Sequence, residues 1–306
     1  DYGMLKNTPE KVYKNLVLQA KNTIKNKSMF KGIFVDEIES FEPEQLSFIR
    51  EFLYKSKYIF NGFECKGLNI SSNLSLFKNS WDNIDFDHII KLEKNYRQSS
   101  PLVEFVNNFD ENSNEYIKGI RPNITDDMYY LSEPVRESNN SVDIIKVSDI
   151  EEQISSVLWE IEYLTHKKGL SYSDIAVVYP FNKKRLKNGK TIYFQYMLKK
   201  DLEENEIPYI YGDDDLTNMS KKVGVTISNI YSIKNLEYKA VIFCELEMLY
   251  NHSINDVKQD YQVNDFIGDL NKVYLAINRS TDYLSIITTF NESASDIIKL
   301  LVESKK

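Results

Sequence analysis

Short apolar runs alternate with stretches of helical periodicity from about residue 100 onward, and this alternation constrains the fold more than any other feature of the sequence. The clearest runs are VDIIKV (142–147), DIAVVY (174–179), KAVIFC (239–244) and YLSIIT (283–288). Shorter strands are expected near 208–211 and 223–228, and helices at 100–109, 150–167, 191–205, 264–278 and 294–304. Short apolar strands that alternate with helices predict an α/β fold, a doubly wound domain with a mostly parallel sheet.

A shorter series of the same kind comes first. A helix is expected at 9–28, a strand at 31–35, a helix from Pro43 through Tyr54, and a strand at 57–60. Strand, helix and strand within about 30 residues indicate a βαβ unit. The Asn- and Ser-rich stretch 64–87 predicts a loop between two domains, 1–88 and 89–306. Residues 111–141 look like an irregular excursion within the second domain.

Composition narrows the class of protein. The chain is 42% hydrophobic and 27% charged, as in globular proteins, and no uncharged apolar run approaches the roughly 18 residues of a membrane span. Cys65 and Cys244 are far apart in sequence, so a reducing cytoplasm is the expected compartment. The net charge of −8 means that any nucleic-acid contact needs a local basic groove.

Two adjacent acids end the first apolar run, in IFVDEIESF (33–41). Asp36 and Glu37 would lie at the carboxyl end of a strand, where parallel sheets gather their ligands. A Mg²⁺ ion with a nucleotide would explain both, one acid holding the metal's water shell and the other orienting the attacking water. The alternative is a cluster that precedes a helix, where acids are favoured.

Two arginines, a lysine and a glutamate lie next to predicted helices and strands, where they could also contact a ligand. Arg97 lies at the entry to a helix in LEKNYRQSSPLVEFVNNF (92–109), and Arg279 lies between a helix and a strand in LNKVYLAINRSTDYLSIITT (270–289). Lys234 and Glu237 lie in the loop between two strands. Taken singly, each arginine is most simply a solvated surface charge, and Lys234 with Glu237 a local ion pair.

The order of these segments resembles that of the superfamily 1 helicases of the UvrD/Rep type. GIFVDEIESFEPEQLSFI, LEKNYRQSSPLVEFVNN, IAVVYP, VTISNIYSIKNLEYKAVIF and VYLAINRSTDYLSII follow one another as in that family, from about residue 30 to 290. The resemblance implies a RecA-like P-loop NTPase helicase fold. Residues 1–88 would be the C-terminal portion of the first motor domain, and 89–306 a complete second motor domain.

The resemblance also implies roles at an ATP site between the two motor domains. Asp36 would hold Mg²⁺ through water, and Glu37 would act on the hydrolytic water. Arg97 and Arg279 match the arginines that reach the γ-phosphate. Lys234 and Glu237 match the ends of the family's KGLE segment at the nucleotide, whose acid contacts the sugar. Closing and reopening around ATP would move the protein along a strand of DNA, with RNA as the alternative track.

The chain also departs from the family pattern. No GxxxxGK[ST] phosphate loop is present, so the loop either belongs to an upstream segment or was lost in this lineage. Glu39 stands where the family has Gln, Phe63 where it has Asp, and Asn235 where it has Gly. These departures leave open whether hydrolysis is coupled to movement.

Aromatic residues are the candidates for stacking on single-stranded nucleic acid. Phe63, Trp81 and Tyr96 are possible platforms, but core packing is the simpler role in a chain with 21 Tyr and 16 Phe.

Three hypotheses follow. The first is the C-terminal part of an ATP-dependent DNA helicase, inactive until joined to a phosphate-loop segment. The second is a degenerate, non-hydrolysing module that binds nucleic acid or a partner protein. The third is an unrelated metal-dependent hydrolase that uses Asp36 and Glu37.

Overall fold

The structure is a computed structural model, and it describes the following residues: 15–20, 32–35, 58–61, 92–120, 122, 131–181, 184–185, 191–192, 194–211, 223–233, 236–249, 260–289 and 296–305. The chain divides into two compact units, Asp1–Ile90 and Lys91–Lys306, and each is described by itself.

In the first unit, a parallel strand pair is the main described feature. Strand β1 (Gly32–Val35) pairs with β2 (Tyr58–Asn61), with Gly32 opposite Tyr58 and Val35 opposite Asn61. The strands predicted at 31–35 and 57–60 are therefore confirmed, as is their parallel pairing. Residues 15–20 are helical. The helix predicted from Pro43 lies outside the described residues.

The second unit is built on a six-stranded sheet whose five strand pairings are all parallel. Its order is β5-β12-β11-β6-β10-β9. The strands are β5 (Val142–Lys146), β6 (Ile175–Tyr179), β9 (Tyr209–Tyr211), β10 (Val225–Asn229), β11 (Tyr238–Phe243) and β12 (Ser280–Thr288). The predicted α/β fold with a parallel sheet is confirmed.

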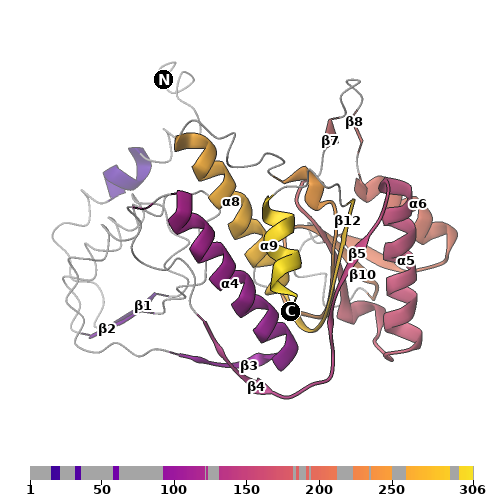
Figure 1. The fold of residues 1–306 in the computed structure, drawn as a ribbon, viewed down its shortest axis with the longest axis horizontal. Helices are drawn as coiled ribbons and strands as arrows, with labels where there is room; N and C mark the ends of the chain where they lie inside the picture. The colour runs from indigo at the N-terminus through magenta and orange to yellow at the C-terminus, as the bar shows by residue number, and fades with distance from the viewer. Residues whose placement is uncertain are drawn as a thin grey trace. The chain divides into compact units, whose positions relative to one another are not determined.

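Helices cover both faces of this sheet (Figure 1). Helices α5 (Ile150–His166) and α6 (Phe194–Glu204) lie on one face. Helices α4 (Ser100–Ile120), α8 (Asp260–Ile277) and α9 (Asp296–Ser304) lie on the other. The buried hydrophobic residues of α5 and α6 recur at helical spacing. They are Ile154, Val157, Ile161 and Leu164 in α5, and Phe194, Leu198 and Leu202 in α6. Two 3₁₀ turns, Tyr172–Asp174 and Leu246–Met248, complete the connections.

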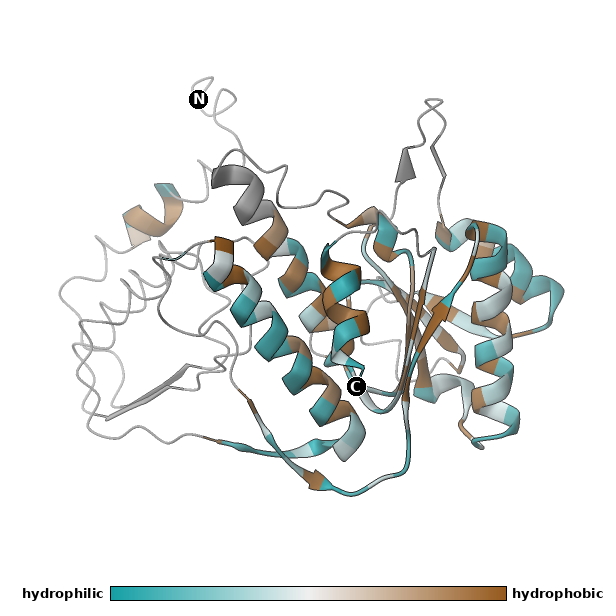
Figure 2. Ribbon diagram, in the orientation of Figure 1, coloured by the Kyte–Doolittle hydropathy of each residue, from teal (hydrophilic) through white to brown (hydrophobic). Residues whose placement is uncertain are grey.

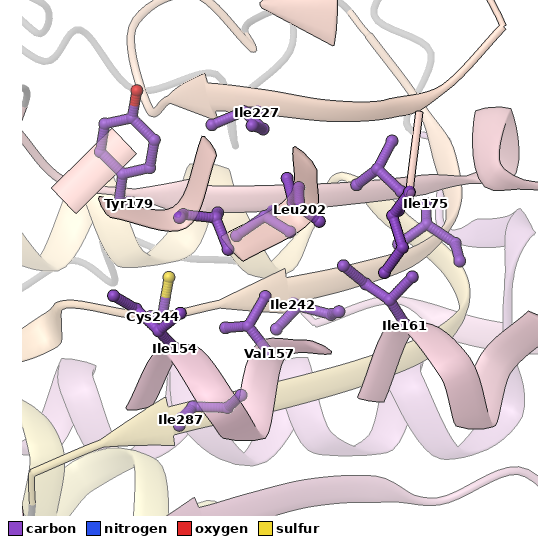
Figure 3. Close-up of a cluster of buried hydrophobic side chains, with 14 of the residues drawn as sticks. Ile154, Val157, Ile161, Ile175, Tyr179, Leu202, Ile227, Ile242, Cys244 and Ile287 are labelled. Carbon is purple, nitrogen blue, oxygen red and sulfur yellow. The ribbon is translucent and has the colours of Figure 1, made fainter. Parts of the chain in front are cut away.

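Central strands are hydrophobic on both sides because helices cover both faces. All five residues of β6 are buried, and Figure 2 shows hydrophobic residues along the strands of the sheet. Under α5 and α6, the residues Ile175, Ile242 and Ile287 meet the helices in one cluster (Figure 3). Cys244 belongs to this cluster and is fully buried. Burial of the cluster fixes the positions of the strand ends, where the polar side chains lie.

The excursion predicted at 111–141 is wrong over its first part. Helix α4 continues to Ile120, and its buried side includes the polar residues Ser113 and Asn114. Asn112 Nδ2 donates to Ser304 Oγ of α9 at 3.0 Å. The face is therefore buried by polar packing against another helix, which a search for apolar periodicity misses.

Further along the same stretch, β4 (Glu133–Arg136) forms a parallel pair with β3 (Lys94–Ser99). The helix predicted from 191 begins at Phe194 instead, because Thr191–Ile192 form β8 opposite β7 (Lys184–Arg185). None of the helices among the described residues has the length and apolar content needed to cross a membrane.

Candidate functional site

Three of the predicted nucleotide-site residues, Arg97, Glu237 and Arg279, come together in the second unit. With Asn278 they form what we call the amino-edge cluster, because it lies where β11 and β12 begin. The other predicted residues of the nucleotide site, Asp36, Glu37 and Lys234, lie outside the described residues, as do the stacking candidates Phe63 and Trp81.

Arg97 connects the strand β3 to both other parts of the cluster. Its Nη1 donates to Glu237 Oε1 at 2.9 Å, and its Nη2 donates to the carbonyl oxygen of Asn278 at 3.1 Å. The Arg97 side chain is 34% exposed and that of Glu237 is 50% exposed, so solvent reaches both. Arg97 was expected at the entry to a helix, and it lies on β3 three residues before α4 begins at Ser100.

Arg279 lies in the short turn that joins α8 to β12. The carbonyl oxygen of Tyr274 accepts from both Asn278 Nδ2, at 2.8 Å, and the Asn278 backbone N–H, at 3.2 Å. Arg279 Nε donates to the carbonyl oxygen of Leu275 at 3.2 Å, which directs the side chain back along α8. The turn thus holds Arg279 close to the end of the helix.

Glu237 is the last residue before β11. The next residue, Tyr238, donates its backbone N–H to the carbonyl oxygen of Arg279 at 3.0 Å. Tyr238 and Ser280 are paired at the start of the two strands. Glu237 and Arg279, the residues just before them, therefore lie at adjacent strand ends. Glu237 pairs with Arg97, a partner that sequence proximity to Lys234 did not suggest.

Sequence reasoning missed two polar side chains that shape β3. Asn95 Oδ1 accepts hydrogen bonds from the backbone N–H groups of Arg97 and Gln98, both at 3.0 Å. Gln98 is fully buried, and its Nε2 donates to the carbonyl oxygen of Ser280 at 3.1 Å. The signal was present in the sequence as an Asn two residues before the Arg, a residue that bonds nearby backbone in turns.

A second arginine supports the same strand from β4. Arg136 Nη1 donates to the carbonyl oxygen of Arg97, and Arg136 Nη2 donates to Asp282 Oδ1 at 2.6 Å. Because Asp282 is part of β12, this pair ties β4 and β3 to the strand that follows Arg279. Sequence reasoning placed this region in an irregular excursion and named neither residue.

The amino-edge cluster contains two guanidinium groups and one carboxylate. A guanidinium presents several N–H donors in a planar fork that matches the oxygens of phosphate or carboxylate. Each guanidinium is therefore of a kind suited to an anionic group; in the structure that of Arg97 binds the Glu237 carboxylate, and that of Arg279 donates to the Leu275 carbonyl. Among the described residues, no group of three or more His, Cys, Asp and Glu side chains could hold a metal ion. Tyr96, 67% exposed, lies beside Arg97 on β3, and its role as a stacking platform stays a prediction.

A different polar group occupies the opposite edge of the sheet. This carboxyl-edge cluster consists of Gln153 from α5 and the residues Cys244, Glu245 and Glu247 that follow β11. Gln153 Oε1 accepts from the Glu245 N–H at 2.5 Å, and its Nε2 donates to Glu247 Oε1 at 3.1 Å. Burial, and then the nearby Glu245 and Glu247, raises the pKa of Cys244 well above its usual value. Glu245 has a left-handed backbone with φ of 60°.

Comparison with known proteins finds a family match, which includes Arg97 of the amino-edge cluster, and similar solved structures. Residues 90–216 match the model of the UvrD-like helicase C-terminal domain. A crystal structure of the C-terminal domain of a possible DNA helicase from Lactobacillus plantarum WCFS1 is similar at 13% identity and a TM-score of 0.37. The match covers 68% of this chain and 94% of that one.

Proposed function

Because residues 90–216 match the UvrD-like helicase C-terminal domain, we propose that this chain is part of a superfamily 1 helicase and supplies the arginines of an ATP site in a DNA-dependent motor. Arg97 and Arg279 would neutralise the γ-phosphate as it is transferred. The observation that carries the proposal is the convergence of Arg97, Glu237 and Arg279 at the paired starts of β11 and β12, from segments far apart in the sequence.

The contacts of Arg97 support this role. Its guanidinium is bonded to a half-exposed carboxylate and to one carbonyl, both of which can be exchanged for phosphate oxygens. A γ-phosphate carries more negative charge than a single carboxylate, so it would compete for the same donors. Arginines that reach a transferring phosphoryl group contribute about 10³ to 10⁵ in rate. Glu237, released from Arg97, would then be available to the hydroxyl groups of the nucleotide sugar.

ATP and Mg²⁺ are the cofactors of the proposed reaction. Asp36 would hold Mg²⁺ through water, Glu37 would orient the attacking water, and Lys234 would lie beside the nucleotide. The metal would supply charge neutralisation between the phosphates. The Arg97 and Arg279 guanidinium groups fit the anionic end of such a ligand, because their donors are N–H groups and their surroundings are partly solvated.

Single-stranded or duplex DNA is the proposed track. Cycles of ATP binding and hydrolysis would change the affinity of the two motor domains for the strand, and an upstream segment with a phosphate loop would complete the nucleotide site. Tyr96, Phe63 and Trp81 would offer aromatic rings to unpaired bases.

The test uses the natural full-length protein that contains this chain, with ATP turnover measured in the presence of single-stranded DNA. Arg97→Ala and Arg279→Ala should each lower kcat by about 10³ or more. Lys200→Ala is the matched control, because it also removes the cation of an exposed ion pair, with Glu204 on α6 at 3.5 Å. The control should keep kcat within about twofold, as exposed pairs contribute little.

Two results would count against the proposal. Full turnover by both arginine variants would show that these residues do not act on the phosphate. A wild-type protein that binds DNA and hydrolyses no ATP would instead support a non-hydrolysing binding module. Thermal unfolding of each variant separates a loss of chemistry from a loss of fold.

A further inference from the structure

The backbone around Arg279 is held at three consecutive carbonyl groups. The carbonyl oxygen of Asn278 accepts from Arg97 Nη2 at 3.1 Å, and that of Ser280 accepts from Gln98 Nε2 at 3.1 Å. Between them, the carbonyl oxygen of Arg279 itself accepts from the backbone N–H of Tyr238 at 3.0 Å. Neighbouring residues of β3 therefore hold the peptide groups on either side of Arg279.

Among the side chains that bond to this backbone, Gln98 is fully buried and hydrogen-bonded at both ends. Oε1 accepts from Asn95 Nδ2 at 3.0 Å, while Nε2 donates to Ser280. Asn95 in turn caps the backbone N–H groups of Arg97 and Gln98. A continuous series of hydrogen bonds thus runs from the backbone that carries Arg97 to the backbone that carries Arg279.

We propose that Gln98 is a positioning residue that fixes the spacing between the two arginines of the proposed ATP site. It touches neither nucleotide nor metal in this role, and it acts through the Ser280 carbonyl on the turn that carries Arg279. Geometry at a reacting centre matters steeply, because a displacement of about 1 Å can cost about 100-fold in rate. The expected effect of Gln98 on the rate of ATP hydrolysis rests on the proposed function. The expected effect of Gln98 on the position of Arg279 rests on the geometry alone.

The variant for the test is Gln98→Met. Methionine has nearly the same length and volume as glutamine but can neither donate to Ser280 nor accept from Asn95, so the core stays filled. Gln153→Met is the matched control. Gln153 is equally buried, uses both ends of its amide, and lies at the opposite edge of the same sheet. Any effect of losing a buried glutamine in general should appear in both variants.

In the full-length protein, Gln98→Met should lower kcat for ATP by about 10- to 100-fold, the size expected for a displaced catalytic group. KM for ATP should change less than about threefold, because the site still binds the nucleotide before the arginine acts. Gln153→Met should leave both constants within about twofold of wild type. In an Arg279→Lys background, Gln98→Met should cost much less than it does alone, because the two changes act on one group.

A second measurement reads the position of Arg279 without any turnover. In the 306-residue chain, the Arg279 Nε–Hε signal in a ¹H–¹⁵N spectrum should shift in Gln98→Met and stay in place in Gln153→Met. If neither variant moves this signal, or both move it equally, the inference is wrong. The same holds if kcat of Gln98→Met equals that of the wild type, or if its loss simply multiplies with that of Arg279→Lys. A wild-type protein without ATPase activity would overturn the proposed function, while the spectrum would still decide the positioning role.

Discussion

One polar pairing at each edge of the six-stranded sheet can be compared, and the two differ in their exposure to solvent. At the amino edge, Arg97 and Glu237 form an ion pair whose side chains are 34% and 50% exposed. At the carboxyl edge, Gln153 is fully buried and joins the N–H of Glu245 to the carboxylate of Glu247. Ligands of parallel sheets commonly gather at the carboxyl edge. In this domain the residues suited to bind an anion lie at the other edge.

The difference teaches how polar groups with a structural role can be told from those available to a ligand. A buried amide hydrogen bond cannot be exchanged with water, so its loss leaves unpaired groups in the core. A partly solvated ion pair exchanges its partner at little cost, because water can replace either charge. Substitutions of Glu237 and of Gln153 should therefore differ in their effect on the free energy of unfolding, even though the two side chains are similar in size.

The largest effect is expected for Gln153→Met. The substitution leaves the N–H of Glu245 and one oxygen of Glu247 without the amide partner they have in the wild type, at a place that is closed to solvent. We expect a loss of about 2 kcal/mol in the free energy of unfolding. Hydrogen exchange of the β11 and β12 amides measures it within the second unit. A loss below about 0.5 kcal/mol would remove the contrast between the two edges.

An intermediate effect of opposite sign is expected for Glu160→Gln on the buried side of α5. Glu160 is 4% exposed, and its Oε1 accepts from Ser285 Oγ at 2.6 Å. Burial raises the pKa of this carboxyl, with Asp143 adding to the rise and Ser285 and Lys168 opposing it. Glutamine keeps an acceptor for Ser285 and removes the buried charge, so the variant should be more stable than wild type at neutral pH by about 1 kcal/mol.

The stability difference between Glu160→Gln and wild type should depend on pH, and the raised pKa of Glu160 sets the direction of that dependence. Below the pKa of an unfolded Glu, about 4.3, the carboxyl is protonated in both states and costs nothing. As the pH rises through the raised folded-state pKa, the unfolded chain ionises first and the wild type loses stability. The advantage of Glu160→Gln should therefore grow with pH above about 4.3. An advantage that shrinks over this range would mean that the ionised form is favoured in the fold.

Much of this fold could be predicted from apolar patterns, because its strands are buried on both faces. The runs expected at 174–179 and 283–288 match β6 and β12 closely. The pattern failed where burial is polar, as in α4 beyond residue 109, where Ser113 and Asn114 face the core. It failed again at Glu133–Arg136, a strand too short and too exposed to leave an apolar signature.

In the candidate site, some residues could be predicted from the sequence and others could not. Arg97, Glu237 and Arg279 could be named from motif order, because a motif records the residue that meets a ligand. Gln98 and Arg136 could not, since each donates to a backbone carbonyl, that of Ser280 for Gln98 and that of Arg97 for Arg136. The Asp282 carboxylate that also accepts from Arg136 is 146 residues away. A side chain that bonds to a carbonyl imposes no residue type on its partner, so the sequence carries no paired signal.

The smallest effect is expected for Glu237→Gln at the amino edge. The change removes the charge that pairs with Arg97 Nη1 and keeps the size of the side chain. Because both side chains are exposed to solvent, the pair should contribute between about 0 and 1 kcal/mol to the free energy of unfolding. Raising the ionic strength from about 0.1 to 1 M should reduce even this difference, since screening acts on exposed charges.

Hydrogen exchange of the same β11 and β12 amides measures the free energy of unfolding of Glu237→Gln, so its loss can be compared directly with that of Gln153→Met. Arg97 keeps its bond to the Asn278 carbonyl in the variant, so the strand β3 should stay in place. A loss of about 2 kcal/mol or more would show that Glu237 is as structural as Gln153. Arg97 would then be held by the fold and unavailable to a phosphate. Glu237→Gln, the substitution with the smallest expected change in the free energy of unfolding, therefore decides between a binding site and a structural ion pair.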